Sequence, residues 1–275
     1  MQKKIAVIND LSGYGRCSLT VAIPVLSVMG HQCCPVPTAI LSNHTEFPVY
    51  FFDDYTEKMT AYTDKWKELG LSFDAVATGF LGSEAQIEIV MDMIRKLESE
   101  ETFVVVDPVM GDHGHAYETY TPEMCEQMKE LVCMADIVLP NVTECCILTD
   151  TPYKKENWTR RELLNMAMML RLMGAKSVVI TGVREGSYYT NVVLERGQME
   201  AKFIRTRSSG GERPVTGDVF SSVVAGALLN GKSLPEAVAQ AAGFVKECIK
   251  VSDEEQIPHA NGVCFEKILG KLIKK

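Results

Sequence analysis

Short, continuous apolar runs alternate with longer amphipathic stretches along most of this 275-residue chain. The runs are rich in β-branched residues and lie at residues 5–8, 75–77, 103–106, 137–139 and 177–180. A continuous rather than alternating apolar pattern is typical of strands buried on both faces of a parallel sheet. The stretches between these runs predict helices near residues 18–29, 55–69, 84–99, 122–134 and 159–173. The sequence therefore predicts an α/β fold with a doubly wound, mostly parallel sheet flanked by helices on both faces.

The pattern changes after Thr181. Residues 188–194 and 199–204 predict an antiparallel pair of strands, and residues 205–214 form a polar stretch expected to be a loop. Helices are expected near 217–230 and 234–251, and a third helix is expected at the end of the chain. No internal repeat and no long linker divides the sequence, so we expect a single domain over residues 1–275.

Charge and cysteine usage exclude several classes of function. The chain has 28 Lys and Arg against 36 Asp and Glu, a net charge of −8. Such a balance argues against nucleic-acid or anionic-membrane binding, which needs excess basic residues on one face. The nine cysteines contain no CxxC spacing, so we expect reduced thiols rather than a zinc or redox site. The first strand begins almost at once and no apolar run reaches ~18 residues, which predicts a cytoplasmic protein without a signal peptide.

Polar residues follow the apolar runs directly. They are Asn9 and Asp10, the segment 79–82, Asp107, Asn141 with Glu144, and Thr181. In doubly wound folds, ligands bind beyond the carboxyl ends of the strands. We therefore expect these residues to border the site.

The glycine-rich segment Gly13–Ser18 imitates a GxGxxG dinucleotide fingerprint. A nicotinamide-binding protein would also need an acidic residue about 20 positions further on, to hold the ribose. The next strand ends near Thr38 without a carboxylate. We therefore interpret the segment as a turn that shapes one wall of a pocket.

Two acidic segments are candidates for binding Mg²⁺. Asp107, at a strand end and fixed by Pro108, can hold the ion directly or through water, although Asp-Pro more often only opens a turn. Asn141 and Glu144 lie one helical turn apart and can face the same crevice, or they can simply cap a helix. These two interpretations of Asn141 and Glu144 are compatible.

The segment Thr216-Gly217-Asp218 precedes a helix of small residues. Free amides at a helix start, with a glycine that allows close approach, form an anion site. A carboxylate placed there can accept a proton from a substrate hydroxyl while the amides hold the phosphoryl group. The alternative is that Asp218 only caps the helix.

Together these segments resemble the ribokinase superfamily and, within it, the vitamin B6 kinases. The landmarks occur in the family's order and are Leu41-Ser42-Asn43-His44-Thr45, Gly79–Ser83, Asp107–Gly111, Pro140–Glu144 and Thr216–Asp218. The Ser-Asn-His-Thr segment points to the pyridoxal kinases rather than to the sugar kinases.

The resemblance implies an ATP-dependent transfer of phosphate to the 5′-hydroxymethyl group of pyridoxal, pyridoxine or pyridoxamine. Asp218 would be the catalytic base, and the amides of Thr216 to Asp218 would stabilise the migrating phosphoryl group. Mg²⁺ and the ATP phosphates would be organised by Asp107, Glu144, Asn141 and Asp112. The pyridine pocket would be lined by Asp10, Leu41, His44, Thr45 and Phe80.

The resemblance also implies further features of the nucleotide side and of the assembly. Thr181 would approach the nucleotide phosphates and a monovalent cation such as K⁺. The loop 205–214 and the segment Ile257–His259 would border the nucleotide. The family pattern further implies a homodimer.

Three residues depart from the family pattern. Val215 replaces a usual glycine, Phe80 a common tyrosine, and Asp10 a usual serine. An ionised Asp accepts hydrogen bonds and donates none. Our hypothesis is that Asp10 favours a substrate that presents a ring N–H⁺ or an amine, such as pyridoxamine or the aminopyrimidine of the thiamin pathway. Two alternatives therefore stay open, a hydroxymethylpyrimidine kinase and a non-catalytic protein that binds vitamin B6.

Overall fold

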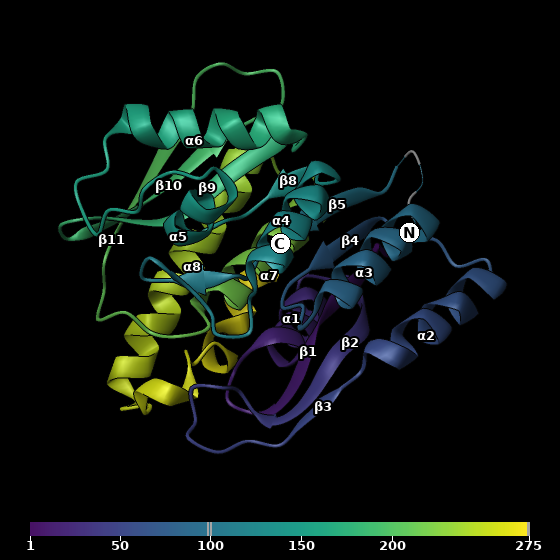
Figure 1. Cartoon of the computed structure of the whole chain (residues 1–275). Coiled ribbons are helices and arrows are strands. Elements are labelled where there is room, and N and C mark those ends of the chain that lie inside the picture. The colour runs from purple at the N-terminus through teal and green to yellow at the C-terminus, as the bar shows by residue number, and fades with distance from the viewer. Residues whose placement is uncertain (98, 100, 274–275) are drawn as a thin grey trace.

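A nine-stranded sheet forms the centre of the computed structural model, which describes residues 1–97, 99 and 101–273 (Figure 1). Its strands are β1 (Lys4–Tyr14), β2 (Gln32–Asn43), β3 (Phe52–Asp54), β4 (Ala75–Thr78), β5 (Phe103–Val106), β8 (Ile137–Val138), β9 (Ser177–Glu185), β10 (Tyr188–Leu194) and β11 (Lys202–Arg207). A separate two-stranded hairpin is made of β6 (Gly111–Asp112) and β7 (His115–Ala116).

The strand order is β11-β10-β9-β8-β5-β4-β1-β2-β3. Every neighbouring pair from β9 to β2 is parallel, whereas β3, β10 and β11 pair antiparallel at the two edges. The predicted doubly wound, mostly parallel α/β sheet is therefore confirmed, together with the antiparallel pair that follows Thr181. Its parallel strands place their carboxyl ends at one edge.

Helices cover both faces of the sheet (Figure 1). They are α1 (Ser18–Val28), α2 (Thr56–Glu68), α3 (Glu84–Leu97), α4 (Pro122–Cys133), α5 (Val142–Leu148), α6 (Arg160–Met173), α7 (Thr216–Leu229) and α8 (Leu234–Glu254). One hydrophobic core lies under α2 to α6 and the other under α1, α7 and α8. In the part of the chain that the structure describes, no helix is long and apolar enough to span a bilayer.

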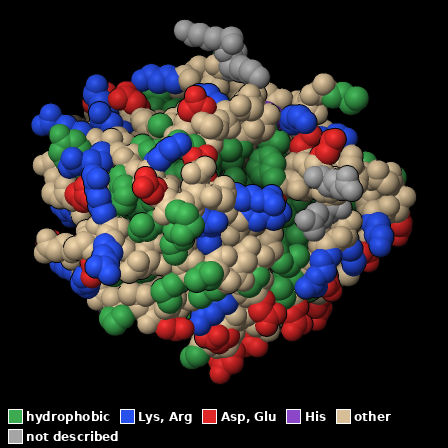
Figure 2. Space-filling view, turned by 90° about the horizontal axis from the view of Figure 1, so that it is seen from above, with side chains coloured by type: hydrophobic (Ala, Val, Ile, Leu, Met, Phe, Trp, Pro, Cys, Tyr) green, Lys and Arg blue, Asp and Glu red, His purple; other side chains and the backbone are tan. Residues whose placement is uncertain are grey.

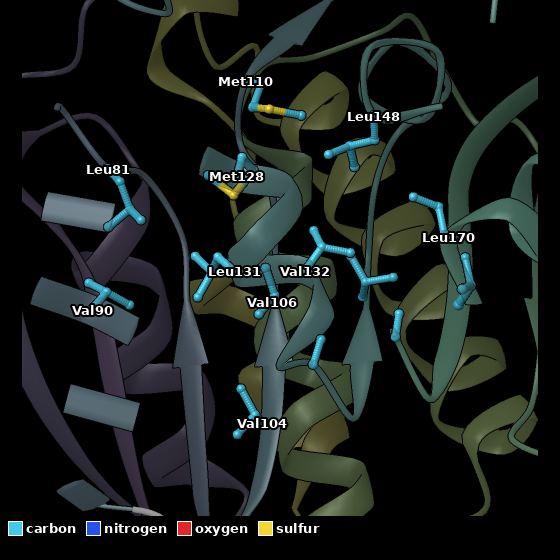
Figure 3. Close-up of a cluster of buried hydrophobic side chains, with 14 of the residues drawn as sticks. Leu81, Val90, Val104, Val106, Met110, Met128, Leu131, Val132, Leu148 and Leu170 are labelled. Atoms are coloured by element: carbon cyan, nitrogen blue, oxygen red, sulfur yellow. The ribbon is translucent and has the colours of Figure 1, made fainter. Parts of the chain in front are cut away.

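The β5 strand shows why the central runs are apolar without interruption. Val104 and Val106 point into one core, while Val105 between them points into the other. Figure 3 shows Val104 and Val106 beneath the α4 residues Met128 and Leu131. Because successive side chains of a strand face opposite sides, a strand covered on both faces needs apolar residues at every position.

Local signals set several helix boundaries where they were predicted. The Thr159 hydroxyl accepts a hydrogen bond from the backbone N–H of Glu162, whose carboxylate accepts one from the Thr159 N–H. This capping box starts α6, and Gly174 ends it with φ at +139°. The predicted helix over 84–99 is described to Leu97; residue 98 lies outside the described residues.

Several boundaries differ from the prediction. β2 continues to Asn43 rather than ending near Thr38. β1 continues to Tyr14, so residues 13 and 14 belong to the strand and only the end of the glycine-rich segment turns. β11 extends to Arg207, which shortens the polar loop. The expected C-terminal helix is replaced by two 3₁₀ segments, η1 (His259–Asn261) and η2 (Glu266–Leu272). Ile268, Leu269 and Leu272 of η2 nevertheless pack against the core under α1, α7 and α8.

Helix α7 begins with a strained residue. Val215 precedes it with φ at +63° and ψ at +14°, the left-handed region that β-branched residues rarely occupy. This is the position where the family pattern has glycine. The left-handed conformation costs an L-residue with a Cβ about 1–2 kcal/mol. The chain therefore keeps the backbone turn that the helix start requires and carries the strain of a valine in it.

Replacement of Val215 tests this strain. We expect Val215→Gly to be more stable than Val215→Ala by about 1 kcal/mol, because glycine adopts positive φ without penalty. Urea unfolding of both variants measures the difference. Ala225, buried within α7, supplies the control site: Ala225→Gly should lower stability there, since glycine is unfavourable in a helix interior. If Val215→Gly is less stable than Val215→Ala, Val215 carries no strain.

Candidate functional site

The predicted site residues gather at the carboxyl edge of the parallel strands. Asn9 lies in β1, Phe80 follows β4, Asp107 follows β5, and Asn141 follows β8. The start of α7 brings Asp218 to the same edge, where its carboxylate contacts the side chain of Asn9. Residues separated by about 210 positions therefore form one crevice.

Asp218 is held by the first strand and the first helix. Its Oδ2 accepts a hydrogen bond from the backbone N–H of Ser18 at 2.9 Å, and its Oδ1 accepts one from Asn9 Nδ2 at 3.4 Å. Desolvation raises the pKa of Asp218 to about 7, and the nearby charge of Asp10 adds to the rise. The hydrogen-bond partners of the Asp218 carboxylate lie in β1 and α1, not in the first turn of α7. The geometry therefore does not support a role for Asp218 that is limited to capping α7.

The pKa of Asp107, like that of Asp218, is raised mainly by burial. Loss of hydration raises the pKa of Asp107 to about 7, the Asp218 charge raises it further, and a hydrogen bond from Ser221 opposes the rise. A carboxyl group with such a pKa is half protonated near neutral pH. Two acids that repel each other in a half-buried crevice form a natural place for a cation.

Glu144 serves both a helix cap and the acidic crevice. Its carboxylate accepts hydrogen bonds from the backbone N–H groups of Asn141 at 2.7 Å and Met110 at 3.2 Å. Burial nevertheless raises its pKa well above the ordinary value, and the charge of Asp107 acts in the same direction. The capping interpretation is confirmed, because a capping box starts α5. The charge of Asp107 acts on the same acid, and a role of Glu144 in binding Mg²⁺ stays a prediction.

Both polar atoms of the Asn141 side chain already have hydrogen-bond partners within the chain. Its oxygen accepts from the Glu144 N–H at 2.9 Å, and its Nδ2 donates to the carbonyl of Gly111 at 2.8 Å. Thr181 lies alongside through a bridge between β9 and residue 141, with its N–H donating to the Pro140 carbonyl. A nucleotide role for Asn141 and Thr181 stays a prediction.

Asp112 lies on the β6–β7 hairpin with its side chain exposed, although its charge still contributes to the raised pKa of Glu144. Its carboxylate accepts from the His113 N–H and lies 3.6 Å from the His113 ring nitrogen. Among the described residues, no three Asp, Glu, His or Cys side chains are grouped to hold a metal ion. The predicted set Asp107, Glu144 and Asp112 is thus not a preformed cage.

The donor chemistry of Asp107 and Glu144 still fits Mg²⁺. This ion prefers oxygen ligands and is commonly held by one or two carboxylates together with substrate phosphates and water. The charge of Asp107 raises the pKa of Glu144, and the charge of Asp218 raises the pKa of Asp107, so a bound cation would relieve repulsion among these acids. A site completed by a nucleotide is therefore consistent with the residues present.

The predicted pocket residues come from β2 and the loop after it. Leu41 is buried in β2, Thr45 is exposed, and His44 Nε2 donates to the carbonyl of Ala260 at 2.7 Å. The Phe80 N–H donates to Asn9 Oδ1 at 2.9 Å. Phe80 is thereby tied to the same asparagine that contacts Asp218, which links the pocket wall to the proposed base.

The segment after α8 closes the far side of the pocket. Asn261 Nδ2 donates to the Tyr14 hydroxyl at 3.0 Å, and Arg16 donates to the Asn261 carbonyl at 3.1 Å. His259 contacts the carbonyl of Glu212, in the loop before α7. Residues 257–259 were expected beside the nucleotide loop, but the contacts of the residues that follow them with Tyr14, Arg16 and His44 were not predicted.

A small cavity lies behind Asp218. Its volume is about 20 Å³, and its polar lining comes from Asn9, Thr78, Asp218, Ser221 and Ser222. The Thr78 hydroxyl is buried and has no hydrogen-bond partner among the described residues. This volume is sufficient for one water molecule.

The surface carries no concentrated basic patch on the face shown in Figure 2. Lys and Arg are scattered there among other side chains, while Asp and Glu gather along one edge. The nine cysteines of the chain are all free thiols, and Cys17, Cys145, Cys146, Cys248 and Cys264 are buried. Neither feature adds a second site to the carboxyl-edge crevice.

The chain is similar to known proteins over most of its length. The family model of phosphomethylpyrimidine kinase matches residues 23–264. The pyridoxine kinase of Bacillus subtilis is 27% identical over 260 residues, covering 92% of this chain and 85% of that protein. A crystal structure of a Bacteroides thetaiotaomicron protein classed as a phosphomethylpyrimidine kinase, determined with pyridoxal, is 40% identical, with a TM-score of 0.94 over 99% of this chain and 96% of that one.

A further solved structure with a similar fold is that of a pyridoxal kinase. The pyridoxal kinase of Lactobacillus plantarum is 27% identical, with a TM-score of 0.91 over 99% of this chain and 97% of that one. The family match spans most of the sequence, and the structural match extends over nearly all of it. The chain therefore belongs to the phosphomethylpyrimidine kinase family, with the ribokinase-like fold of the pyridoxal kinases.

Proposed function

We propose that this protein transfers the γ-phosphoryl group of ATP to the 5′-hydroxymethyl group of a B6 vitamer, forming the 5′-phosphate. The observation that carries the proposal is the placement of Asp218. Its carboxylate lies at the start of α7, held by Ser18 and Asn9, with a pKa near 7. The similarity to the Bacteroides protein determined with pyridoxal supports the choice of substrate.

Asp218 is suited to accept the proton of the substrate hydroxyl. As the hydroxymethyl oxygen forms a bond to the γ-phosphorus, its proton passes to Asp218, and the bond between that phosphorus and the β–γ bridging oxygen breaks to release ADP. A base with a pKa near the working pH combines an available deprotonated form with sufficient basicity. The unpaired amides at the start of α7, from Thr216 and Gly217 to Asp218, would hold the moving phosphoryl group.

Asp107 and Glu144 would hold the Mg²⁺ that accompanies the nucleotide. When bound, the ion neutralises charge on the phosphates and lowers the repulsion between the acids. Thr181 and Asn141 would border the phosphates, and a monovalent cation such as K⁺ would lie near Thr181. Asp112, on the exposed hairpin, would approach the ion only if the hairpin moves toward the bound nucleotide.

A second copy of the chain is a further part of the proposal. Val49, Tyr50, Phe51 and Phe52 are exposed and lead into β3, the last strand of the sheet. Exposed apolar residues beside an open strand edge mark interaction sites. These residues support the predicted homodimer. The proposed location of the enzyme, as predicted from the sequence, is the cytoplasm.

Hydroxymethylpyrimidine kinase activity is the second candidate. The family model supports it, and the chemistry would be unchanged because that substrate also presents a hydroxymethyl group on a nitrogen heterocycle. A non-catalytic binding protein is the third possibility. It gives no reason for Asp218 to be held by two separate elements at the start of an anion-binding helix.

A coupled assay for ADP release separates these candidates. Wild-type protein is supplied with ATP, Mg²⁺ and, in turn, pyridoxal, pyridoxine, pyridoxamine and hydroxymethylpyrimidine. We expect the highest kcat/KM with one of the three B6 vitamers. A preference for hydroxymethylpyrimidine would establish the second candidate instead, and ligand binding without ADP release would establish the non-catalytic one.

Asp218→Asn tests the proton acceptor. We expect kcat to fall by roughly 10²–10⁴-fold while ATP binding is retained, because the amide cannot take the proton. Glu236→Gln is the matched control, since Glu236 occupies the corresponding first-turn position of α8 and only caps that helix. A kcat loss below tenfold in folded Asp218→Asn would return Asp218 to a structural role.

Asp107→Asn tests the electrostatic cost of the crevice. A carboxyl pKa raised from 3.8 to about 7 means that folding becomes less favourable as pH rises between those values. The neutral variant avoids this cost, so we expect it to be more stable than wild type by about 1–2 kcal/mol at pH 8, and by less at pH 5, without Mg²⁺. Urea unfolding at both pH values measures the difference.

The same variant should lose most of its Mg²⁺-dependent turnover, because one oxygen ligand of the ion has lost its charge. Stability and activity would then change in opposite directions at a single position, as is common where acids are buried for function. Equal stability of the two proteins at pH 8 would show that Asp107 is fully hydrated.

A further inference from the structure

Ser18 connects the two carboxylates Asp10 and Asp218. It is the first residue of α1, it is 6% exposed, and its φ is +50°. Its backbone N–H donates to Asp218 Oδ2 at 2.9 Å, while its hydroxyl donates to Asp10 Oδ1 at 2.5 Å. One residue thus uses its backbone to hold one acid and its side chain to hold the other.

Asp10 is a rigid anchor for this contact. Its second oxygen accepts from the hydroxyl of Ser12 at 2.8 Å, and its N–H donates to Asn9 Oδ1 at 3.0 Å. Asp10 is 6% exposed and lies in β1, in the middle of the sheet. Because both carboxylate oxygens accept hydroxyl protons from the same strand–helix segment, Asp10 fixes Ser18 more firmly than a solvated side chain would.

The two oxygens of Asp218 are held unequally. Oδ2 receives the 2.9 Å bond from the Ser18 backbone, whereas Oδ1 receives only a 3.4 Å contact from Asn9. Hydrogen bonds weaken quickly beyond about 3.2 Å. Oδ1 is therefore the oxygen with more capacity to accept another proton.

The conformation of Ser18 depends on its hydroxyl bond. A serine with positive φ is strained by about 1 kcal/mol or more, and such strain persists only where surrounding contacts impose it. The bond to Asp10 supplies such a contact. Without it, no side-chain contact anchors residue 18 to Asp10, and its backbone N–H is free to leave Asp218 even where the residue tolerates positive φ.

We propose that Ser18, anchored by Asp10, is a positioning residue that fixes the rotamer of Asp218 and leaves Oδ1 as the proton-accepting oxygen. The inference rests on the proposed function for its catalytic consequence, but its geometric part concerns only this chain. It also gives Asp10 a role in the transfer step rather than in the choice among vitamers.

An effect of Ser18 on turnover could arise from a change in charge around Asp218 or from a change in the position of Asp218, and the groups around Asp218 allow the two to be separated. The acids that influence Asp218 or are influenced by it are Asp10 from β1 and Asp107 after β5, together with Cys17 before α1 and Tyr117 after β7. Substitution of Ser18 removes no charged group, but it removes one hydrogen bond that lowers the pKa of Asp10. Loss of the Ser12 hydroxyl acts on the Asp10 pKa in the same direction, so an effect seen with Ser18 and not with Ser12 reports position.

Ser18→Gly is the informative variant, because glycine keeps the backbone N–H, tolerates positive φ and lacks the hydroxyl. Ser12→Ala is the matched control: it removes the other hydroxyl that binds Asp10, but Ser12 does not contact Asp218. We expect Ser18→Gly to lower kcat by about 10–100-fold with each B6 vitamer, the range of a misplaced catalytic group, while KM for vitamer and ATP changes less than threefold. Ser12→Ala should keep kcat within threefold of wild type.

A kcat within threefold of wild type in Ser18→Gly would overturn the proposal, and so would a loss confined to the KM of one vitamer. The second result would assign the Asp10–Ser18 pair to vitamer specificity. If Ser18→Gly does not fold, Ser18→Ala removes the same hydroxyl and is judged by the same criteria.

A crystal structure of Ser18→Gly tests the geometric part without any turnover. We expect Asp218 to leave its wild-type rotamer or to adopt more than one. An unchanged Asp218 carboxylate, still bonded to residue 18, would contradict the inference even in an active enzyme. If wild type releases no ADP with any substrate, the proposed function fails, and this structural comparison still decides the role of Ser18.

Discussion

Desolvation of carboxylates at one edge of a parallel sheet is the constraint on which the site depends. Asp107, Glu144 and Asp218 all have raised pKa values because the fold removes water from them before any ligand binds. Such an arrangement is unfavourable in the isolated chain, and the two hydrophobic cores on either side of the sheet must offset it. The arrangement serves the function, because these carboxylates can bind a cation that accompanies phosphate and can accept a proton from the substrate.

The start of α7 shows how the fold directs this chemistry. Val215 adopts a left-handed conformation despite its branched side chain, and Asp218 follows in the first helical turn. The turn aims free amides and a carboxylate at the same crevice. Ser18 and Asn9 then hold that carboxylate from the opposite side, so its orientation is set by two elements that are far from α7 in the sequence.

Much of this could be predicted from single residues and spacings. Uninterrupted apolar runs indicated strands buried on both faces, and Val104 to Val106 show the cause, because adjacent valines enter different cores. The polar residues after those runs were expected at one edge, and the hydrogen bond from the Phe80 N–H to Asn9 confirms it for two of these segments. Ser18 was missed because its importance lies in a backbone N–H, which carries no sequence signal, and in a positive φ that serine seldom adopts.

The sequence by itself determined the layered α/β architecture, the helix starts with capping signals, and the identity of the acids available for chemistry. These follow from local periodicity and from side-chain type, which are properties of short segments. Only the tertiary structure decided which oxygens are occupied: Asn141 is used within its own cap, Asp112 stays on an exposed hairpin, and Asp10 binds serines. Hydrogen bonding and desolvation depend on groups brought together from distant parts of the chain, so they are settled only when the sheet and its helices assemble.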